Sequence, residues 1–221
     1  MKSYTLAALF ILSIGTISAQ QADDVSITIG RLKYGGGGDW YQDQSALPNL
    51  IDYLNKVAPV KGVFTGKYVE PGSKDLFEYP ILWMTGHGNV KFTEDELQRL
   101  RLYLTSGGFL WADDCYGMDK SFRREMKRLF PDNELVELPF NHPIYHCFYD
   151  FPNGPPKIHE HDGLPAQGLG IFYQGRLVVF YTYQTDIGDG MEDITVHNDP
   201  PEKHEAALKF GTNVIIYALT H

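Results

Sequence analysis

Cysteine and basic residues are both scarce in this chain of 221 residues. Its 19 Lys and Arg stand against 28 Asp and Glu, and the formal net charge is −9. The sequence therefore offers no basic patch of the kind that nucleic acids or anionic membrane surfaces attract, and we expect no nucleic-acid partner. The two cysteines, Cys115 and Cys147, leave a single disulfide and two free thiols as alternatives.

Long hydrophobic runs are missing as well. The apolar run at residues 6–17 is well short of the roughly 20 residues that a transmembrane helix needs. It follows Lys2 and precedes the small residues Ser18 and Ala19, which is typical of a cleaved secretory signal peptide. No cysteine lies near the cleavage point, so a lipoprotein anchor is not indicated. We therefore expect a signal peptide over residues 1–20 and a periplasmic or secreted mature chain with no transmembrane segment.

The rest of the chain alternates strand-like and helix-like segments. Short apolar and β-branched runs predict strands at residues 25–33, 62–65, 79–85 and 109–112. Apolar residues at helical spacing predict helices at residues 47–57, 94–106, 121–130 and 202–219. Thr93 and Glu96 form a capping box at the start of the second of these helices. This alternation predicts one α/β domain over residues 21–221, with a mainly parallel sheet.

The last third of the chain has a different pattern. Residues 168–173 and 176–183 predict a hairpin that turns at Gln174 and Gly175 and adds antiparallel strands at one edge of the sheet. Residues 140–166 show no clear period and predict an excursion over the surface of the domain. Residues 186–201 are acidic and contain glycine, and they predict a loop.

Polar residues follow several of the predicted strands at the point where each strand ends. In an open α/β sheet, ligands bind beyond the carboxyl ends of the parallel strands. We therefore expect a ligand-binding site at this edge of the sheet. Its candidate residues are Gly37, Asp39, Trp40, Tyr41, His87, Asp113, Asp114 and Asp186.

The four glycines at residues 35–38 suggest a phosphate-binding loop, but their surroundings argue against one. A Walker loop needs Gly-Lys-Ser/Thr after its glycines, whereas Asp39 and Trp40 follow here. A dinucleotide-binding fingerprint that starts at Gly35 would need glycine at position 40. We interpret the loop as a tight bend whose residues need positive φ or close approach to a ligand, with a purely structural turn as the alternative.

Six stretches of the sequence carry a family resemblance: RLKYGGGGDWYQD, LFEYPILWMTGHG, TEDELQRLRLYLTSGGFLWADDCYG, SFRREMKRLFP, LPFNHPIYHCFY and GTNVIIYALT. They resemble the bacterial family known as domain of unknown function 4159, over about residues 27–220. The resemblance implies a fold like that of class I glutamine amidotransferases, which is a flavodoxin-like doubly wound sheet. It implies no activity, because the family has no established activity to transfer.

The amidotransferase-like fold suggests one catalytic hypothesis. Class I amidotransferases use a cysteine nucleophile at a strand-to-helix elbow and a late His-x-Glu pair, so Cys115, His197 and Asp199 become candidate catalytic residues. The elbow lacks the usual Gly-x-Cys-x-Gly, and Asp113 and Asp114 precede the thiol, where their charges would raise its pKa. We therefore favour a disulfide or a buried, unreactive thiol for Cys115.

A divalent metal is the other candidate ligand at this edge, because histidine and carboxylate side chains suit such ions. Its candidate ligands are His87, Asp113, Asp114, His142, His146, His159 and His161. Pro143 argues against a shared helical face for His142 and His146. No other cofactor is expected.

The sequence thus favours an exported α/β domain that binds a small polar ligand or a cell-envelope protein, without glutamine amidotransferase activity. Aromatic residues beside carboxylates also suit a carbohydrate or peptide ligand. The alternative function is a hydrolase or amidase that uses Cys115, or a metal bound by His and Asp, at the same edge.

Overall fold

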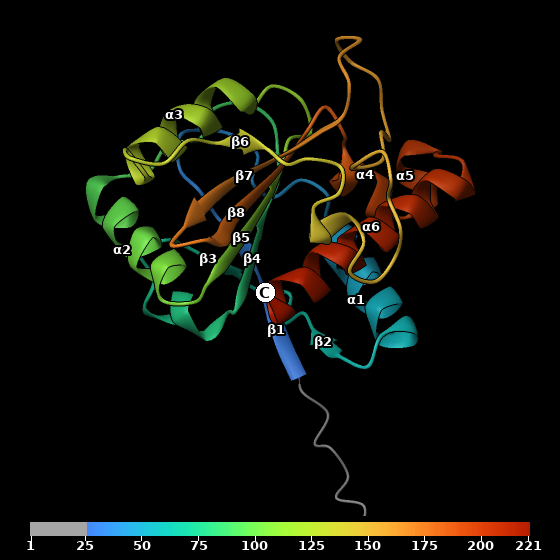
Figure 1. Ribbon diagram of the computed structural model, residues 1–221, viewed down its shortest axis with the longest axis horizontal. Coiled ribbons are helices and arrows are strands. Elements are labelled where there is room, and N and C mark those ends of the chain that lie inside the picture. Colours follow the sequence, from blue (N-terminus) through green and yellow to red (C-terminus); the bar gives the residue numbers. More distant parts are fainter. Residues whose placement is uncertain (1–25) are drawn as a thin grey trace, which may run out of the picture.

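The computed structural model describes residues 26–221, and the signal peptide expected over residues 1–20 lies outside this part. A twisted sheet forms the centre (Figure 1). Its parallel strands are β1 (Ser26–Leu32), β2 (Lys61–Val63), β3 (Tyr68–Val69), β4 (Ile81–Met84), β5 (Phe109–Asp113) and β8 (Arg176–Tyr183). β7 (Gln167–Tyr173) pairs antiparallel with β8 on one side and with β6 (Val136–Glu137) on the other.

The strand order is β2-β1-β4-β5-β8-β7-β6, and β3 also pairs with β1. The predicted mainly parallel sheet and the hairpin at its edge are therefore confirmed. From β2 to β8 the order is consistent with a flavodoxin-like fold, in which the chain first adds a strand on one side of β1 and then returns to the other.

Helices cover both faces of the sheet (Figure 1). On one face lie α1 (Ala46–Val57), α4 (Ile187–Met191) and α6 (Pro201–Thr220), and α5 (Ile194–His197) lies next to α4. On the other face lie α2 (Glu94–Thr105) and α3 (Asp119–Leu129). Two short 3₁₀ turns, η1 (Lys74–Glu78) and η2 (Pro143–Tyr145), complete the regular structure. None of the helices in residues 26–221 combines the length and the hydrophobicity needed to cross a bilayer.

The central strands supply both hydrophobic cores. Every residue of β4 and β5 is buried, as expected for parallel strands that are covered on both sides. Successive side chains point to opposite faces, so Trp83 and Trp111 join the core under α1 and α6, while Leu82 and Leu110 join the core under α2 and α3. This packing fixes the strand ends that carry the polar residues.

The predicted capping box is present at the start of α2, where the Thr93 hydroxyl accepts from the Glu96 backbone N–H and the Glu96 carboxylate accepts from the Thr93 N–H. The helix is followed by Gly107 at a φ of 116°, in the left-handed region that glycine enters without a steric penalty.

Two expectations about the last third of the chain are wrong. Residues 186–201 are not a loop, because they contain α4 and α5, and every residue of α4 is buried. Residues 140–166 do not simply run over the surface, because Ile144, Tyr145 and Ile158 belong to the core under α6. In both segments the structure depends on contacts with residues far away in the chain, which a local pattern does not reveal.

Candidate functional site

The loops that follow β1, β4 and β5 bring three polar side chains together at the carboxyl edge of the sheet. Asp43 comes from the loop between β1 and α1, Thr85 follows β4, and Cys115 follows β5. All three are buried. Asp43 Oδ2 accepts hydrogen bonds from the Thr85 hydroxyl at 2.7 Å and from the Cys115 thiol at 3.1 Å. The thiol also lies 2.9 Å from Thr85 Oγ1, so the three groups form a closed triangle.

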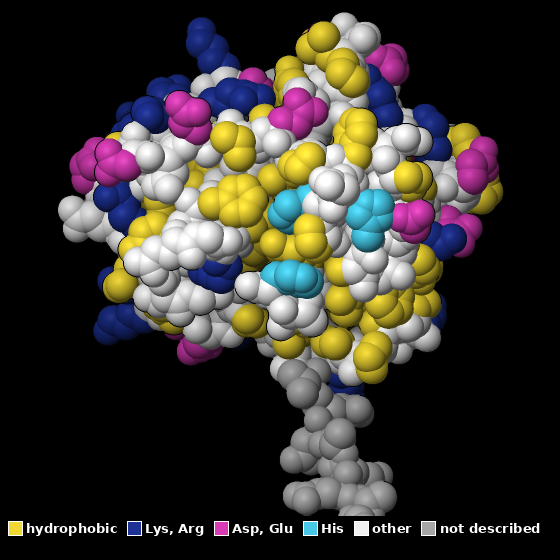
Figure 2. Space-filling model, viewed as in Figure 1, with side chains coloured by type: hydrophobic (Ala, Val, Ile, Leu, Met, Phe, Trp, Pro, Cys, Tyr) yellow, Lys and Arg dark blue, Asp and Glu magenta, His cyan; other side chains and the backbone are white. Residues whose placement is uncertain are grey.

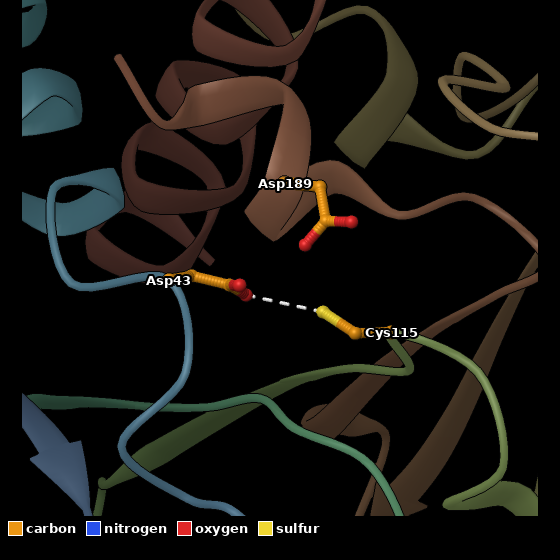
Figure 3. Close-up of side chains that lie close together, drawn as sticks. All are labelled: Asp43, Cys115 and Asp189. Carbon is orange, nitrogen blue, oxygen red and sulfur yellow. Dashed lines mark hydrogen bonds between the residues drawn. The ribbon is translucent and has the colours of Figure 1, made fainter. Parts of the chain in front are cut away.

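Asp189, from α4, approaches the same point from the opposite side, and Figure 3 shows its carboxylate directed toward Asp43 and Cys115. Burial and then the charge of Asp189 raise the pKa of Asp43 well above its usual range. Burial alone would raise the pKa of Asp189, but hydrogen bonds from His159 and Asp43 lower it. A proton that resides on Asp43 and is shared with an ionised Asp189 accounts for both directions.

The environment of Cys115 keeps its thiol protonated. The side chain is only 1% exposed. Burial, followed by the charges of Asp43, Asp113 and Asp189, raises the pKa of the Cys115 thiol well above its ordinary value. Because the thiolate is the nucleophilic form, this position suits a structural thiol.

Asp189 also belongs to a second cluster, which is centred on His159 from the segment before β7. His159 Nδ1 lies 3.1 Å from Asp186 Oδ2 and 3.2 Å from Asp189 Oδ2. Its Nε2 lies 3.0 Å from Asp199 Oδ1. Hydrogen bonds to Asp186 and Asp189 raise the pKa of His159 to about 10, so without a ligand the ring carries a positive charge among three carboxylates.

Two more imidazoles border the His159 cluster. His161 Nε2 lies 2.5 Å from Asp186 Oδ2, and its ring stacks on Tyr116 with the centroids 4.4 Å apart. His197 Nε2 lies 3.1 Å from Glu192 Oε2 and 3.7 Å from Asp189 Oδ1. The cluster is therefore continuous from the buried Asp43 to half-exposed histidines at the surface.

Three carboxylate oxygens in these clusters are buried and, apart from the proton that Asp43 and Asp189 share, have no hydrogen-bond partner among the described residues. They are Oδ1 of Asp43, Oδ1 of Asp186 and Oδ1 of Asp189. Buried polar atoms in native proteins are nearly always paired, so unpaired carboxylate oxygens indicate a place where a bound group supplies the partner.

Two of the expected ligand-binding residues, Asp113 and Asp114, instead accept hydrogen bonds from other residues of the protein. Asp113 accepts hydrogen bonds from the Thr182 hydroxyl, the Thr185 hydroxyl and the Gly188 N–H. Asp114 Oδ1 accepts from the Met118 N–H at the start of α3. Burial raises the pKa of Asp113 to about 7 and that of Asp114 to about 6, although these hydrogen bonds lower both values.

The glycine loop packs against the segment that follows β4. Gly36 and Gly37 have φ values of 103° and 88°, as expected for the bend. A Cβ at Gly36 would lie 2.7 Å from the Asn89 carbonyl oxygen, so close backbone approach explains this glycine. Beyond the loop, Asp39 Oδ2 lies 3.0 Å from His87 Nδ1, which makes a half-exposed pair that contains none of the residues of the His159 cluster.

Trp40 and Tyr41 line a separate pocket rather than the carboxylate clusters. The Trp40 ring lies 5.6 Å from that of Tyr41 and 4.8 Å from that of Tyr68. The pocket has a volume of about 390 Å³ and is lined by Arg31, Trp40, Tyr41, Gln44, Phe64, Gly66, Lys67 and Tyr68. The guanidinium of Arg31 is occupied by the carbonyl oxygens of residues 42–44.

The three candidate catalytic residues are not joined to one another by hydrogen bonds in residues 26–221. Cys115 contacts Asp43 and Thr85, whereas His197 pairs with Glu192 and Asp199 pairs with His159. Both cysteines are free thiols, which settles the disulfide alternative for this structure.

Of the candidate metal ligands, His159 and His161 lie in the clusters described above, whereas His142 and His146 lie elsewhere. On the face that Figure 2 shows, histidine side chains lie among apolar ones. His142 packs against Tyr145, Phe172 and Tyr217, and His146 pairs with the exposed Asp150.

Sequence reasoning missed Asp43, Thr85 and Asp189. Thr85 is the last residue of the predicted strand 79–85, which is a local signal, whereas Asp43 lies about ten residues beyond the predicted strand 25–33 and carries none. Asp189 lies in the segment that was expected to be a loop, and only its partners identify it. Asp186 adopts a left-handed conformation with a φ of 56°, and such strained non-glycine residues concentrate at functional sites.

Comparison with known proteins gives one family match. The model of the family described as "Domain of unknown function (DUF4159)" matches residues 28–219. No curated protein matches the chain. Because the match spans nearly all of the described residues, the chain belongs to the DUF4159 family.

Proposed function

We propose that this domain binds a small polar ligand at the carboxyl edge of the sheet and does not act as a glutamine amidotransferase. The observation that carries this proposal is the unpaired, buried Oδ1 of Asp186, which lies in the same group of carboxylates as Asp43 and Asp189, a pair with only one shared proton between them. A ligand that carries positive charge or several hydrogen-bond donors would pair with these oxygens.

The contacts of Cys115 support the second half of the proposal. An amidotransferase needs a thiolate next to a general base. The neighbours of the Cys115 thiol are a carboxyl group and a hydroxyl group, and neither His159 nor His197 donates to or accepts from it. The proposal includes export of the protein, in line with the signal-like residues 1–20, so that it meets its ligand outside the cytoplasm.

The experiment measures calorimetric binding of donor-rich cationic probes, spermidine and glucosamine, in the presence of EDTA. Succinate and phosphate serve as anionic comparison probes. We expect the cationic probes to bind and the anions not to bind, and we expect Asp186→Asn to weaken binding by about tenfold or more, because it removes a buried charge partner. Asp150→Asn, in the exposed pair with His146, is the matched control.

Equal binding to the wild type and to Asp186→Asn, or a preference for the anions, would contradict the proposed ligand site. Ammonia release from glutamine is measured in parallel. A rate that depends on Cys115, tested with Cys115→Ser, would contradict the absence of amidotransferase catalysis.

A metal-dependent hydrolase is the second candidate function, and the arrangement of one imidazole and two carboxylates at His159 favours it. Hydrolysis of p-nitrophenyl acetate and p-nitrophenyl phosphate, with and without added Zn²⁺, tests it. Turnover that requires Zn²⁺ and disappears in His159→Gln would support this function over simple binding.

A further inference from the structure

His159, Asp186 and Asp189 present one nitrogen and two carboxylate groups to a common point. One ligand atom from each residue lies within 4.8 Å of the other two. His159 Nδ1 lies 3.1 Å from Asp186 Oδ2 and 3.2 Å from Asp189 Oδ2. In a tetrahedral zinc site with bonds of about 2.0–2.1 Å, neighbouring ligand atoms are about 3.3 Å apart. The two distances from His159 Nδ1 therefore match the spacing between neighbouring ligand atoms of a bound zinc ion.

Hydrogen bonding from a protonated His159 would give similar distances, so the unpaired oxygens decide between the two interpretations. The Nδ1 atom carries at most one hydrogen, and two carboxylates face it. Oδ1 of Asp186 has no hydrogen-bond partner, and Oδ1 of Asp189 has none besides the proton shared with Asp43, while these residues are only 1% and 9% exposed. A divalent cation would neutralise both carboxylates, which one N–H cannot do.

The opposite side of the His159 ring has the contact that metal-bound histidines make. His159 Nε2 lies 3.0 Å and 3.2 Å from the two carboxylate oxygens of Asp199. A proton held at Nε2 by Asp199 leaves the Nδ1 lone pair directed at Asp186 and Asp189. His161 Nε2 contacts the same Asp186 oxygen and holds that carboxylate in place.

We propose that His159, Asp186 and Asp189 bind a divalent transition-metal ion, with Zn²⁺ as the favoured ion and Asp199 orienting the imidazole. The inference rests on the proposed function that this edge of the sheet is a ligand site, and it names the class of ligand. Three protein ligands leave a fourth coordination position free for water or a further ligand.

The chemistry of the ligand set favours a transition metal over Mg²⁺ or Ca²⁺. Mg²⁺ and Ca²⁺ take six or more oxygen ligands, whereas imidazole nitrogen suits zinc and its neighbours. The other cluster around Asp189 is a poorer site, because Asp43 and Cys115 are both buried and closed to an ion that arrives from solvent. The His159 ring is also partly exposed, which gives an ion access from solvent.

The test uses the mature chain after EDTA treatment and dialysis. Zn²⁺ is titrated calorimetrically against a competing chelator, and bound metal is counted by elemental analysis after gel filtration. Co²⁺ replaces Zn²⁺ in a second titration, where visible absorption reports the coordination geometry. The compared proteins are the wild type, His159→Gln, Asp189→Asn, Asp199→Asn and the control Asp150→Asn.

We expect one Zn²⁺ per chain in the wild type and in Asp150→Asn. His159→Gln and Asp189→Asn should lower the affinity by about 100-fold or more, because each removes a ligand, and Asp199→Asn should lower it by about 10- to 100-fold as an orienting residue. Circular dichroism checks folding. If Asp189→Asn does not fold, His159→Gln, at a partly exposed position, provides the decisive comparison.

Zinc binding that is absent from the wild type, or unchanged in His159→Gln, would overturn the inference. The readouts separate it from the proposed function. If spermidine or glucosamine binds in EDTA but Zn²⁺ does not bind, the ligand site stands and the metal inference fails. If Zn²⁺ binds with the expected variant pattern while no cationic probe binds, the metal inference stands and the organic-ligand proposal fails.

Discussion

The thiol of Cys115 lies 3.1 Å from Oδ2 of Asp43, so a carboxyl group occupies the place beside the thiol where a cysteine nucleophile needs an imidazole. This contact explains why Cys115, at a strand end of a mainly parallel sheet, has the properties of a structural side chain. It also makes the thiol a reporter on the integrity of the site.

The two thiols should react at different rates with dithiobis(nitrobenzoate) at pH 8. Cys115 is buried and its thiolate is disfavoured, so we expect it to react only when the protein unfolds. Cys147 is partly exposed, although burial raises its pKa to about 11, and it should react slowly in the native state. Cys147→Ser and Cys115→Ser separate the two signals. Rapid native labelling of Cys147→Ser would contradict the buried, neutral thiol.

Asp43→Asn should stabilise the fold by about 1 kcal/mol at pH 8, measured by urea denaturation. The amide oxygen can accept from Thr85 and Cys115, its NH₂ can donate to Asp189, and folding at pH 8 no longer requires protonation of a carboxyl group. Asp43 has a φ of 57°, which asparagine adopts readily. Asp52→Asn, at an exposed position of α1, is the control. A loss of stability would mean that the neighbouring Arg31 needs the Asp43 charge.

Asp114 should make the stability of the wild type depend on pH. Burial raises its pKa to about 6 in the folded state, above its ordinary value of 3.8. Its favourable contribution is therefore complete below about pH 3.8 and is lost as the pH rises through about 6. Relative to Asp114→Asn, the wild type should lose about 2 kcal/mol of unfolding free energy between about pH 4.5 and 7.5. If the wild type instead gains stability relative to Asp114→Asn as the pH rises, the hydrogen bond from the Met118 N–H dominates over burial.

Gly188→Ala should disturb the site and the fold together. A Cβ at Gly188 would lie 2.1 Å from Asp43 Oδ2 and 3.2 Å from Thr85 Oγ1. We expect a loss of about 1–3 kcal/mol from overpacking, and faster labelling of Cys115, whose hydrogen-bond acceptor must move. Gly72→Ala is the matched control, since the nearest atom would be 3.9 Å from its Cβ. Equal stability and labelling in both variants would contradict this tight packing.

The central sheet could be predicted from the sequence because its signals are local. The strands around Leu82 and Leu110 are continuous apolar runs, and Thr93 and Glu96 mark the start of α2 within four residues. The rule that ligands bind at the carboxyl ends of parallel strands also pointed to the correct edge for Asp186.

The helix α4 could not be predicted, because tertiary contacts override local preference there. It is only five residues long and contains Gly188 and Gly190, which are poor helix formers. Packing explains both glycines, since a Cβ at Gly190 would lie within 3.0 Å of Ala207 and Ile158. Asp189 is held between these two glycines, so the segment that looked like a loop supplies the side chain shared by both clusters.

The path of residues 140–166 was equally hidden, because one distant side chain determines much of it. The Asn213 side chain in α6 donates to the carbonyl oxygens of Ile144 and Tyr149 and accepts from the Tyr149 N–H. These contacts join segments more than 60 residues apart and leave no periodic signal in the sequence. The approach of His159 to the carboxylates depends on this route.

The packing of α1 against α6 has a consequence for biosynthesis. A nascent chain that has completed β5 presents Trp83 and Trp111 on a sheet face that the still untranslated α6 will cover. Asp43 likewise lacks its neighbouring carboxyl group until α4, which carries Asp189, has been synthesised. The amino-terminal half therefore cannot bury these aromatic side chains by itself, and a fragment that ends after β5 would be prone to aggregation.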